Sequence, residues 1–307
     1  MNTANNFLIK AFKKPVPKEF NGELRLDVNN ANQSNESQNL TFLNAGFWYF
    51  RREYMAEFLG TLILVLFGDG AVAQGVLNPA AKGSAYLTIN LGFGLGLGMG
   101  VYVASTVSGA HLNPAITLAN CVLRKFPWRK LPGYFLAQLL GGIFGAALVM
   151  LVSFPAIQHL DEGVRMTSGP MATAGIFATF PPDYVSNFSA FMIELVSTAF
   201  LVIGILGVSD PRHKTPSWLA PIAIGGVITA IGMCTGWLTG FALNPARDFG
   251  PRLFTAMAGW GTEPFTSHGY YFIIPIIAPI LGALAGLATY DFLVAPPTEQ
   301  METPDYS

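Results

Sequence analysis

A tetrapeptide that twice stands at the start of a short apolar segment is the chain's clearest candidate for a functional centre. Leu-Asn-Pro-Ala stands at 112–115 and again at 243–246, an offset of 131 residues. Proline suits the first helical turn, where its missing N–H costs nothing, and asparagine before it suits the N-cap. Each motif therefore predicts a short helix whose N-terminus carries an amide side chain and partial positive charge. The residues concerned are Asn113, Pro114, Ala115, Asn244, Pro245 and Ala246.

Three charged side chains stand near these motifs in apolar sequence. Arg247 lies three residues after Asn244, about one turn into the second short helix, and lining a water-filled pore would make its charge tolerable; a salt bridge inside the bundle is the alternative. Glu57 and Glu194 occupy matching strings of the two halves. As a proton relay they would indicate a coupled transporter, whereas as acceptors of backbone N–H groups they would only support the pore. His111 also has two possible roles, that of a pH sensor and that of a packing residue.

Asp69 is a further acidic residue in an apolar run, flanked by Gly68 and Gly70. A carboxylate facing lipid is costly. We expect it to face a vestibule or a neighbouring protomer.

The elements that position these residues follow from composition and length. The chain has 307 residues, of which 51% are hydrophobic and 11% charged, and its mean hydropathy is +0.44. Soluble domains carry about 25% charged residues, so the composition predicts a membrane protein. Six apolar runs are long enough to cross a hydrocarbon core as helices. They are residues 54–76, 85–107, 131–154, 188–208, 218–238 and 270–294.

Two shorter segments, 113–123 and 244–257, begin at the Asn-Pro pairs and are too short to cross. A third copy of the tetrapeptide, 77–80, has no such segment after it, and we interpret it as an ordinary Asn-Pro turn. Two ordinary connecting helices would be the simpler interpretation of the short segments. Their matched positions and the paired glutamates favour half-helices instead.

The pattern predicts an inverted repeat, about 51–154 and 188–294, because three crossings per half give the halves opposite topology. The two half-helices then enter from opposite faces, and their N-termini meet near the middle of the bilayer. We expect the residues before each asparagine to be extended, with Gly109 and Gly240 allowing close backbone approach. Irregular backbone at membrane depth must be buried or line a wet cavity, so a pore lined on one side by carbonyls is predicted.

These residues resemble the major intrinsic proteins, which comprise the aquaporins and aquaglyceroporins. The resemblance covers roughly residues 50–294, and its longest strings are SGAHLNPA at 108–115 and GFALNPARDFGP at 240–251. It implies an all-α membrane fold of six transmembrane helices plus two Asn-Pro-Ala half-helices. It also implies a homotetramer in which each protomer has its own pore. The pore carbonyls would come from Gly109, Ala110, His111, Leu112, Gly240, Phe241, Ala242 and Leu243.

The glycerol-conducting branch of the family is the most similar. By resemblance the selectivity filter consists of Phe93, Gly232, Phe241 and Arg247. A water-selective relative typically has histidine where this chain has Gly232, so glycine predicts a wider constriction. Asp248 directly after the filter arginine is usual in glycerol channels; stabilising the half-helix start is its alternative role. The expected solutes are glycerol, other small neutral solutes and water, with ions and protons excluded.

A strictly water-selective channel and, less favoured, a proton-coupled carrier are the alternatives. No nucleophile motif or metal-ligand spacing occurs in a suitable context, so neither an enzyme nor a metal or other cofactor is expected. Near-balanced charge argues against nucleic acid as a partner.

The ends of the chain and its loops predict its orientation. Residues 1–50 form a polar N-terminal tail, expected to be disordered over 1–46, and 295–307 form a short C-terminal tail, outside the channel domain at 51–294. Thirteen Lys and Arg residues fall on the side of both termini and four on the other. Because cytoplasmic loops carry the positive excess, both termini are expected in the cytoplasm, with the plasma membrane as the default location.

Overall fold

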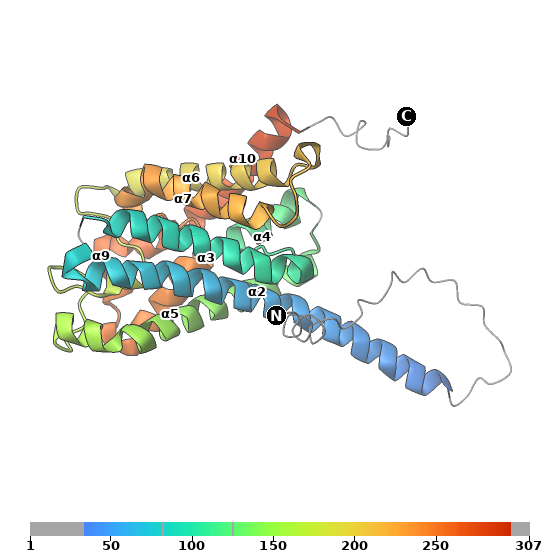
Figure 1. Ribbon diagram of the computed structural model, residues 1–307, viewed down its shortest axis with the longest axis horizontal. Helices are drawn as coiled ribbons and strands as arrows, with labels where there is room; N and C mark the ends of the chain where they lie inside the picture. Colours follow the sequence, from blue (N-terminus) through green and yellow to red (C-terminus); the bar gives the residue numbers. More distant parts are fainter. Residues whose placement is uncertain (1–33, 82, 125, 296–307) are drawn as a thin grey trace, which may run out of the picture. The chain divides into compact units, whose positions relative to one another are not determined.

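Six long helices and three short ones make up most of the chain in the computed structural model, which describes residues 34–81, 83–124 and 126–295 (Figure 1). The long helices are α2 (Ser34–Leu77), α3 (Ala85–Ser108), α5 (Leu131–Asp161), α6 (Asn187–Ser209), α7 (Ala220–Thr239) and α10 (Ile274–Leu293). The short helices are α4 (Pro114–Leu123), α8 (Pro245–Thr255) and α9 (Glu263–Tyr270). Single helical turns connect them: η1 (Pro79–Ala81), η2 (Trp128–Lys130), η3 (Ala174–Ile176), η4 (Pro211–His213), η5 (Ala256–Trp260) and η6 (Tyr271–Ile273).

The described part of the chain contains six segments long and apolar enough to span a membrane. They are Arg51–Leu77, Ala85–Ser108, Trp128–Asp161, Asn187–Ser209, Ala220–Thr239 and Glu263–Leu293. Each contains most of one run predicted from the sequence. The helices α4 and α8 begin one residue after Asn113 and Asn244, as the Asn-Pro pairs predict. The prediction of six crossings and two half-helices is therefore confirmed.

The N-terminal part of α2 corrects one expectation. The chain divides into two compact units, 1–47 and 48–307. Helix α2 begins at Ser34, so residues 34–46, for which disorder was expected, are helical. Extending an existing helix adds a hydrogen bond for each residue fixed and needs no new nucleus, so polar residues can continue it. The rest of the expected tail, 1–33, and most of the C-terminal tail, 296–307, lie outside the described residues.

Equivalent helices of the two halves pack against each other within the second unit. Helix α3 packs on α7, and each half-helix packs on the third span of the opposite half, α4 on α10 and α8 on α5. Gly94 of α3 meets Gly225 of α7: a Cβ on Gly225 would lie 2.4 Å from the Gly94 carbonyl oxygen. The absent side chains thus allow the two backbones to touch, as small residues do in membrane helix pairs.

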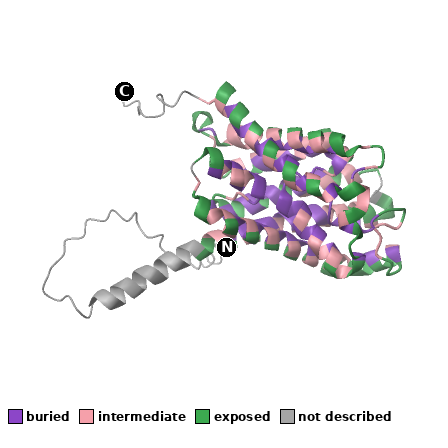
Figure 2. Cartoon of the chain, turned by 180° about the vertical axis from the view of Figure 1, so that it is seen from behind, coloured by how far each residue is buried: buried purple, intermediate pink, exposed green. Residues whose placement is uncertain are grey.

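Burial follows the arrangement expected in a bilayer. Figure 2 shows buried residues concentrated inside the bundle and exposed ones on its outside and at its ends. Large apolar side chains are exposed on the outer helix faces, among them Leu95, Leu151, Val152, Phe188 and Phe200. Water would disfavour such a surface and hydrocarbon would not, so the described bundle suits a multi-pass membrane protein.

The third tetrapeptide behaves as an ordinary turn. Helix α2 ends at Leu77, and the Asn78 side chain accepts a hydrogen bond from the Ala80 N–H at 3.0 Å, which starts the three-residue turn η1. Asn78, Pro79 and Ala80 are exposed, and the next long helix, α3, begins at Ala85. The tetrapeptide therefore starts a half-helix only where an apolar segment follows it.

Candidate pore and constriction

Each half-helix is capped by its own asparagine. The Asn113 side-chain oxygen accepts from the Ala115 N–H at 2.8 Å. The Asn244 oxygen accepts from Ala246 N–H at 2.9 Å and Arg247 N–H at 3.3 Å. These bonds satisfy N–H groups that a helix start otherwise leaves free.

The remaining half of each asparagine side chain reaches across the repeat. Asn113 Nδ2 donates to the Leu243 carbonyl at 2.8 Å, and Asn244 Nδ2 donates to the Leu112 carbonyl at 2.7 Å. The two half-helix N-termini are thereby tied to each other. An amide carries two N–H groups, so each asparagine has a second one to offer to a solute.

The loops before the asparagines are not extended, which corrects the sequence expectation. Positive φ angles occur at Gly109 (84°), Ala110 (51°) and Leu112 (51°), and in the other half at Gly240 (81°), Phe241 (39°) and Leu243 (54°). Left-handed backbone at non-glycine residues costs free energy and persists only where the surroundings determine it. The sequence signalled the two glycines but not the strained residues after them.

The buried glutamates supply that determination. Glu57 accepts from the His111 N–H at 2.9 Å and the Leu112 N–H at 2.7 Å. Glu194 accepts in the same way from Ala242 at 3.0 Å and Leu243 at 2.8 Å. Because the loop N–H groups turn toward the glutamates, the loop carbonyls are left to face the other way. This geometry is the supporting role that the sequence analysis weighed against a proton relay.

Two further pairs complete the loop supports, and the sequence analysis missed them. The hydroxyls of Ser108 and Thr239 donate to the same glutamates, at 2.6 and 2.7 Å. The hydroxyls of Tyr134 and Tyr271 donate to the carbonyls of those two residues, at 2.9 and 3.4 Å. A hydroxyl residue directly before each repeat glycine was the available signal for the first pair.

His111 lies beside α4 with its ring packed among aromatic rings. Its ring centroid is 4.7 Å from that of Phe126 and 5.2 Å from that of Tyr134. Its Nδ1 lies 3.2 Å from Thr117 Oγ1. These contacts agree with the packing role that was one of its two sequence alternatives.

Two cavities meet at three side chains. The first cavity, of about 210 Å³, is lined by the two loops, both asparagines and apolar side chains of four spans. The second cavity, of about 360 Å³, lies under the segment 175–182 and the ends of α3 and α7. Of the residues that the structure describes, three line both cavities: Phe93, Phe241 and Arg247. Three of the four residues predicted as the filter thus form the boundary between the cavities.

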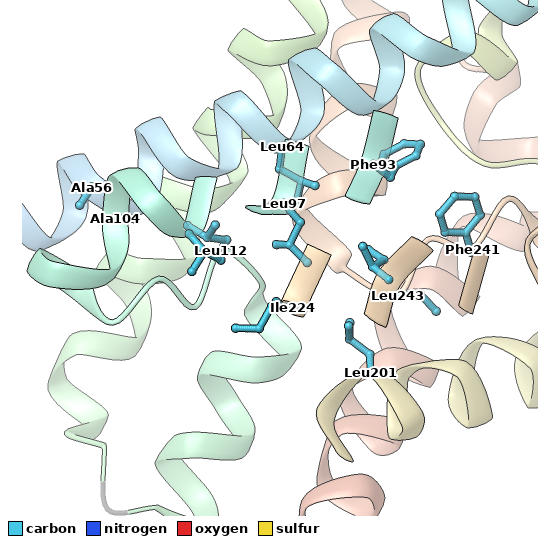
Figure 3. Packing of buried hydrophobic residues seen from close by; sticks show 12 residues of the cluster. Ala56, Leu64, Phe93, Leu97, Ala104, Leu112, Leu201, Ile224, Phe241 and Leu243 are labelled. Atoms are coloured by element: carbon cyan, nitrogen blue, oxygen red, sulfur yellow. The ribbon is translucent and has the colours of Figure 1, made fainter. Parts of the chain in front are cut away.

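The first cavity has one polar and one apolar side. Loop residues 109–113 and 241–244 supply the polar side. The apolar side includes Leu64, Leu97, Leu201 and Ile224, which Figure 3 shows converging from different elements, with Phe93 and Phe241 near each other. Such a passage offers hydrogen bonds to hydroxyl groups and an apolar wall to carbon atoms.

Arg247 is fixed from three directions. Its Nη1 donates to the Phe177 carbonyl at 3.1 Å and lies 3.2 Å from Asp69 Oδ1. Its guanidinium carbon lies 4.3 Å from the centroid of the Phe93 ring, a cation–π distance. Arg247 thus lines both cavities and also has a buried acidic partner, so its contacts fit both sequence alternatives, pore lining and a buried salt bridge.

The expectation that Asp69 faces a vestibule or a neighbouring protomer was wrong. Its exposed fraction is 0%, and it points at Arg247 inside the bundle. Helix periodicity alone could not distinguish these faces, because the partner lies 178 residues further along the chain.

Gly232 is placed differently from the other three filter residues. Gly232 is absent from the described residues that line the two cavities. A Cβ built on it would lie 2.4 Å from Asn90 Oδ1 and 3.1 Å from Phe241 Cε2. The missing side chain of Gly232 therefore leaves room for the Asn90 amide and for the Phe241 ring of the boundary. Asn90 was missed because nothing in its own sequence surroundings indicates contact with α7.

Asp248 ties the second half-helix to the loop above it. It accepts from Thr179 N–H at 2.8 Å and from Arg252 Nε at 2.8 Å. Both Asp248 and Arg252 have exposed fractions of 0%. This is the stabilising role that the sequence analysis gave as the alternative to a glycerol-channel marker.

Comparison with known proteins agrees with this geometry. The family "Major intrinsic protein" matches residues 45–290, and the chain belongs to that family of membrane channels. "Aquaglyceroporin-2" of Rhizophagus irregularis is 48% identical over 255 residues, covering 82% of this chain and 80% of the relative. "Aquaporin-10" of Homo sapiens is 42% identical over 245 residues, covering 80% and 81%.

A solved structure extends the likeness to the fold. The X-ray structure of the aquaglyceroporin from Plasmodium falciparum has a TM-score of 0.73 and 33% identity, and it covers 80% of this chain and 98% of that chain. The predicted family and fold, six spans with two half-helices, are confirmed.

Proposed function

We propose that this protein is a passive transmembrane channel for glycerol, other small uncharged solutes and water. The observation that carries the proposal is the boundary formed by Phe93, Phe241 and Arg247 between two cavities, the first of which has carbonyls on one side and apolar side chains on the other. The names of the similar proteins, which include aquaglyceroporins, support the same assignment.

A polyol suits this boundary because it has two chemical faces. Its carbon atoms would lie against Phe93 and Phe241, whose ring centroids are 5.2 Å apart with the planes at 76°. Its hydroxyls would accept hydrogen bonds from Arg247 and donate to loop carbonyls. Beyond the boundary the solute would pass Asn113 and Asn244, whose second amide N–H groups bind its oxygen.

Exclusion of ions and protons would follow from the same groups. Both half-helix N-termini aim partial positive charge at the asparagine pair, which opposes cations; aquaporins are the general example of such exclusion. A water molecule that accepts from both asparagines is oriented away from forming a continuous donor chain. No covalent step is required of any residue, and we propose no enzymatic activity, cofactor or metal.

We further propose a plasma-membrane location with both termini in the cytoplasm, because six crossings put the two ends on one side and the positive excess lies there. A homotetramer is proposed from the family resemblance, with lipid around it. Cross-linking of the purified protein and protease protection of tagged termini in sealed vesicles test these two statements.

The transport proposal is tested in proteoliposomes by stopped-flow light scattering, with gradients of glycerol and of an impermeant sugar. We expect fast glycerol and water flux from the unchanged protein. Gly232→His should block glycerol and retain water, and the matched control Gly232→Ala makes the same Cβ contact with Asn90 without adding a ring. Water flux without glycerol flux in the unchanged protein would overturn the proposal in favour of a strict water channel.

A further inference from the structure

The filter arginine has an acidic partner that the family resemblance does not supply. Asp69 lies in α2 next to Gly68, and the missing side chain of that glycine admits the Phe93 ring: a Cβ there would lie 2.1 Å from Phe93 Cε1. Phe93 therefore packs on the α2 backbone. Asp69, the next residue, is carried to the same level as the boundary between the cavities.

The carboxylate of Asp69 has one cationic neighbour among the described residues. Its Oδ1 lies 3.2 Å from Arg247 Nη1, and neither oxygen accepts a well-aligned hydrogen bond from the described residues. The other buried acid of this region, Asp248, has a cation of its own, since Arg252 Nε donates to it at 2.8 Å. The charges here thus form two separate pairs, and Asp69 belongs to Arg247.

Arg247 is also the boundary residue whose position depends most on its polar contacts. Phe93 and Phe241 are held by packing, whereas a guanidinium on a flexible stem has several rotamers. Its Nη1 contacts Phe177 and Asp69, and neither of these partners is among the described residues that line the two cavities. An unpaired guanidinium between two wet cavities would gain hydration by moving into them.

We infer that Asp69 is a positioning residue of the selectivity filter: it draws the Arg247 side chain against the pore wall and offsets its charge there. The passage is then wide enough for a polyol, and the constriction selects by size and hydrogen bonding more than by net charge. Exclusion of cations then depends chiefly on the half-helix N-termini. This inference deepens the proposed function and depends on Arg247 lining the path.

The repeat supports a role in selection. Glu57 and Glu194 correspond to each other at an offset of 137 residues, and at that offset Asp69 corresponds to Leu206. The glutamates that support the loops occur in both halves. The Asp69 carboxylate occurs only in the first half, and it lies beside Arg247. An element of the common scaffold would be expected in both.

The test is a double-mutant cycle in proteoliposomes with Asp69→Asn, Arg247→Ala and both together. We expect Asp69→Asn to lower the glycerol-to-water permeability ratio at least threefold, because the released guanidinium narrows the passage for the larger solute. In the Arg247→Ala background the same change should leave the ratio within 1.5-fold. Thr61→Val is the matched control: it also alters a fully buried polar side chain of α2 that has no hydrogen-bond partner among the described residues, and the ratio should not change.

Three results would overturn the inference: an unchanged ratio in Asp69→Asn, an equal fall with and without Arg247, or the same fall in Thr61→Val. If Asp69→Asn does not yield folded protein, recovery of folded channel in the double variant supports the coupling, and failure of both variants refutes it. Failure of the proposed function is seen separately, as an unchanged protein that conducts water alone. In that case the displacement of the Arg247 guanidinium would be detected through water flux. Asp69→Asn should lower the water flux, and adding Arg247→Ala should restore it. An undiminished water flux in Asp69→Asn would refute the inference.

Discussion

Replacing Glu194 by glutamine should disable the pore without altering its selectivity. The Glu194 carboxylate is fully buried and accepts from Thr239 Oγ1 at 2.7 Å, Ala242 N–H at 3.0 Å and Leu243 N–H at 2.8 Å. Glutamine has a single acceptor oxygen, and its NH₂ group would face a backbone N–H where the second carboxylate oxygen stood. At least one of the two loop N–H groups then loses its acceptor.

The cost can be worked from these contacts. A hydrogen bond to a charged group contributes about 1.5–3 kcal/mol, and a buried donor left unsatisfied costs about 1–3 kcal/mol. With one N–H orphaned and the remaining bonds weakened, the ordered loop loses about 2–4 kcal/mol. Since 1.4 kcal/mol is about a factor of ten in an equilibrium constant, the population with the strained loop in place falls by about 30-fold or more.

Stopped-flow permeability per reconstituted channel is the assay, with thermal unfolding of the purified protein alongside. Water and glycerol permeability should fall together by at least tenfold, because the loop carbonyls line the path of both, and the unfolding temperature should drop. Glu53→Gln is the control: Glu53 lies on α2, one turn before the other buried glutamate, and pairs with Lys130 at 2.6 Å near the surface. Pairs near the surface contribute about 0–1 kcal/mol, and this one is only partly buried, so this variant should behave almost normally.

The same experiment decides between channel and carrier. Wild-type permeability and stability in Glu194→Gln would refute the supporting role. A flux that follows a proton gradient, and loses that dependence in a fully stable Glu194→Gln protein, would establish the proton-coupled carrier instead.

Three further predictions concern other parts of the structure. Asp248→Asn should destabilise the protein by about 3–5 kcal/mol, because it leaves the fully buried Arg252 without its counter-ion. Size-exclusion chromatography should show a loss of folded protein, and a normal yield would contradict this prediction. Asn113→Ala should lower the free energy of unfolding by about 1 kcal/mol, because the helix cap is lost. It should also raise the proton leak in vesicles carrying a pH dye, and an unchanged leak would contradict the role of the asparagine pair. The side-chain bonds from Arg212 hold the pKa of Asp210 well below its ordinary value, so this pair stabilises the protein at neutral pH, and the stabilisation is lost progressively as the pH falls from about 4 toward the lowered pKa. The difference in unfolding temperature between wild type and Asp210→Asn should therefore be present at pH 7 and disappear in acid, and a difference that grows in acid would contradict it.

Local rules account for the parts of the site that could be predicted from the sequence. The half-helices begin where an asparagine cap and a proline coincide, and the cap needs only neighbouring residues. The paired glutamates were recognisable because both halves carry them at corresponding places. Arg247 was expected to line a water-filled pore because an unpaired cation in lipid is costly.

Contacts between distant segments account for what could not be predicted. The space beside Gly232 depends on Asn90 of another helix, and the left-handed backbone at Ala110 and Leu112 depends on Glu57. A sequence pattern shows how often residues recur along one helix, not which helix faces them. The expectation for Asp69 was wrong for this reason.

The inverted repeat separates support from selection. Capping asparagines, loop glutamates, hydroxyls and tyrosines occur in both halves and hold two equivalent strained loops. The boundary residues do not occur in both halves. At the offset of 131, Arg247 corresponds to Ile116, and Phe241 corresponds to Ala110. A symmetric protein would place the same constriction twice along the path, and a solute would have to pass both. Because the residues that break the symmetry line the boundary between the two cavities, the proposed channel would select its solute once and leave the remaining path to hydrogen-bond it, which suits rapid passive flux.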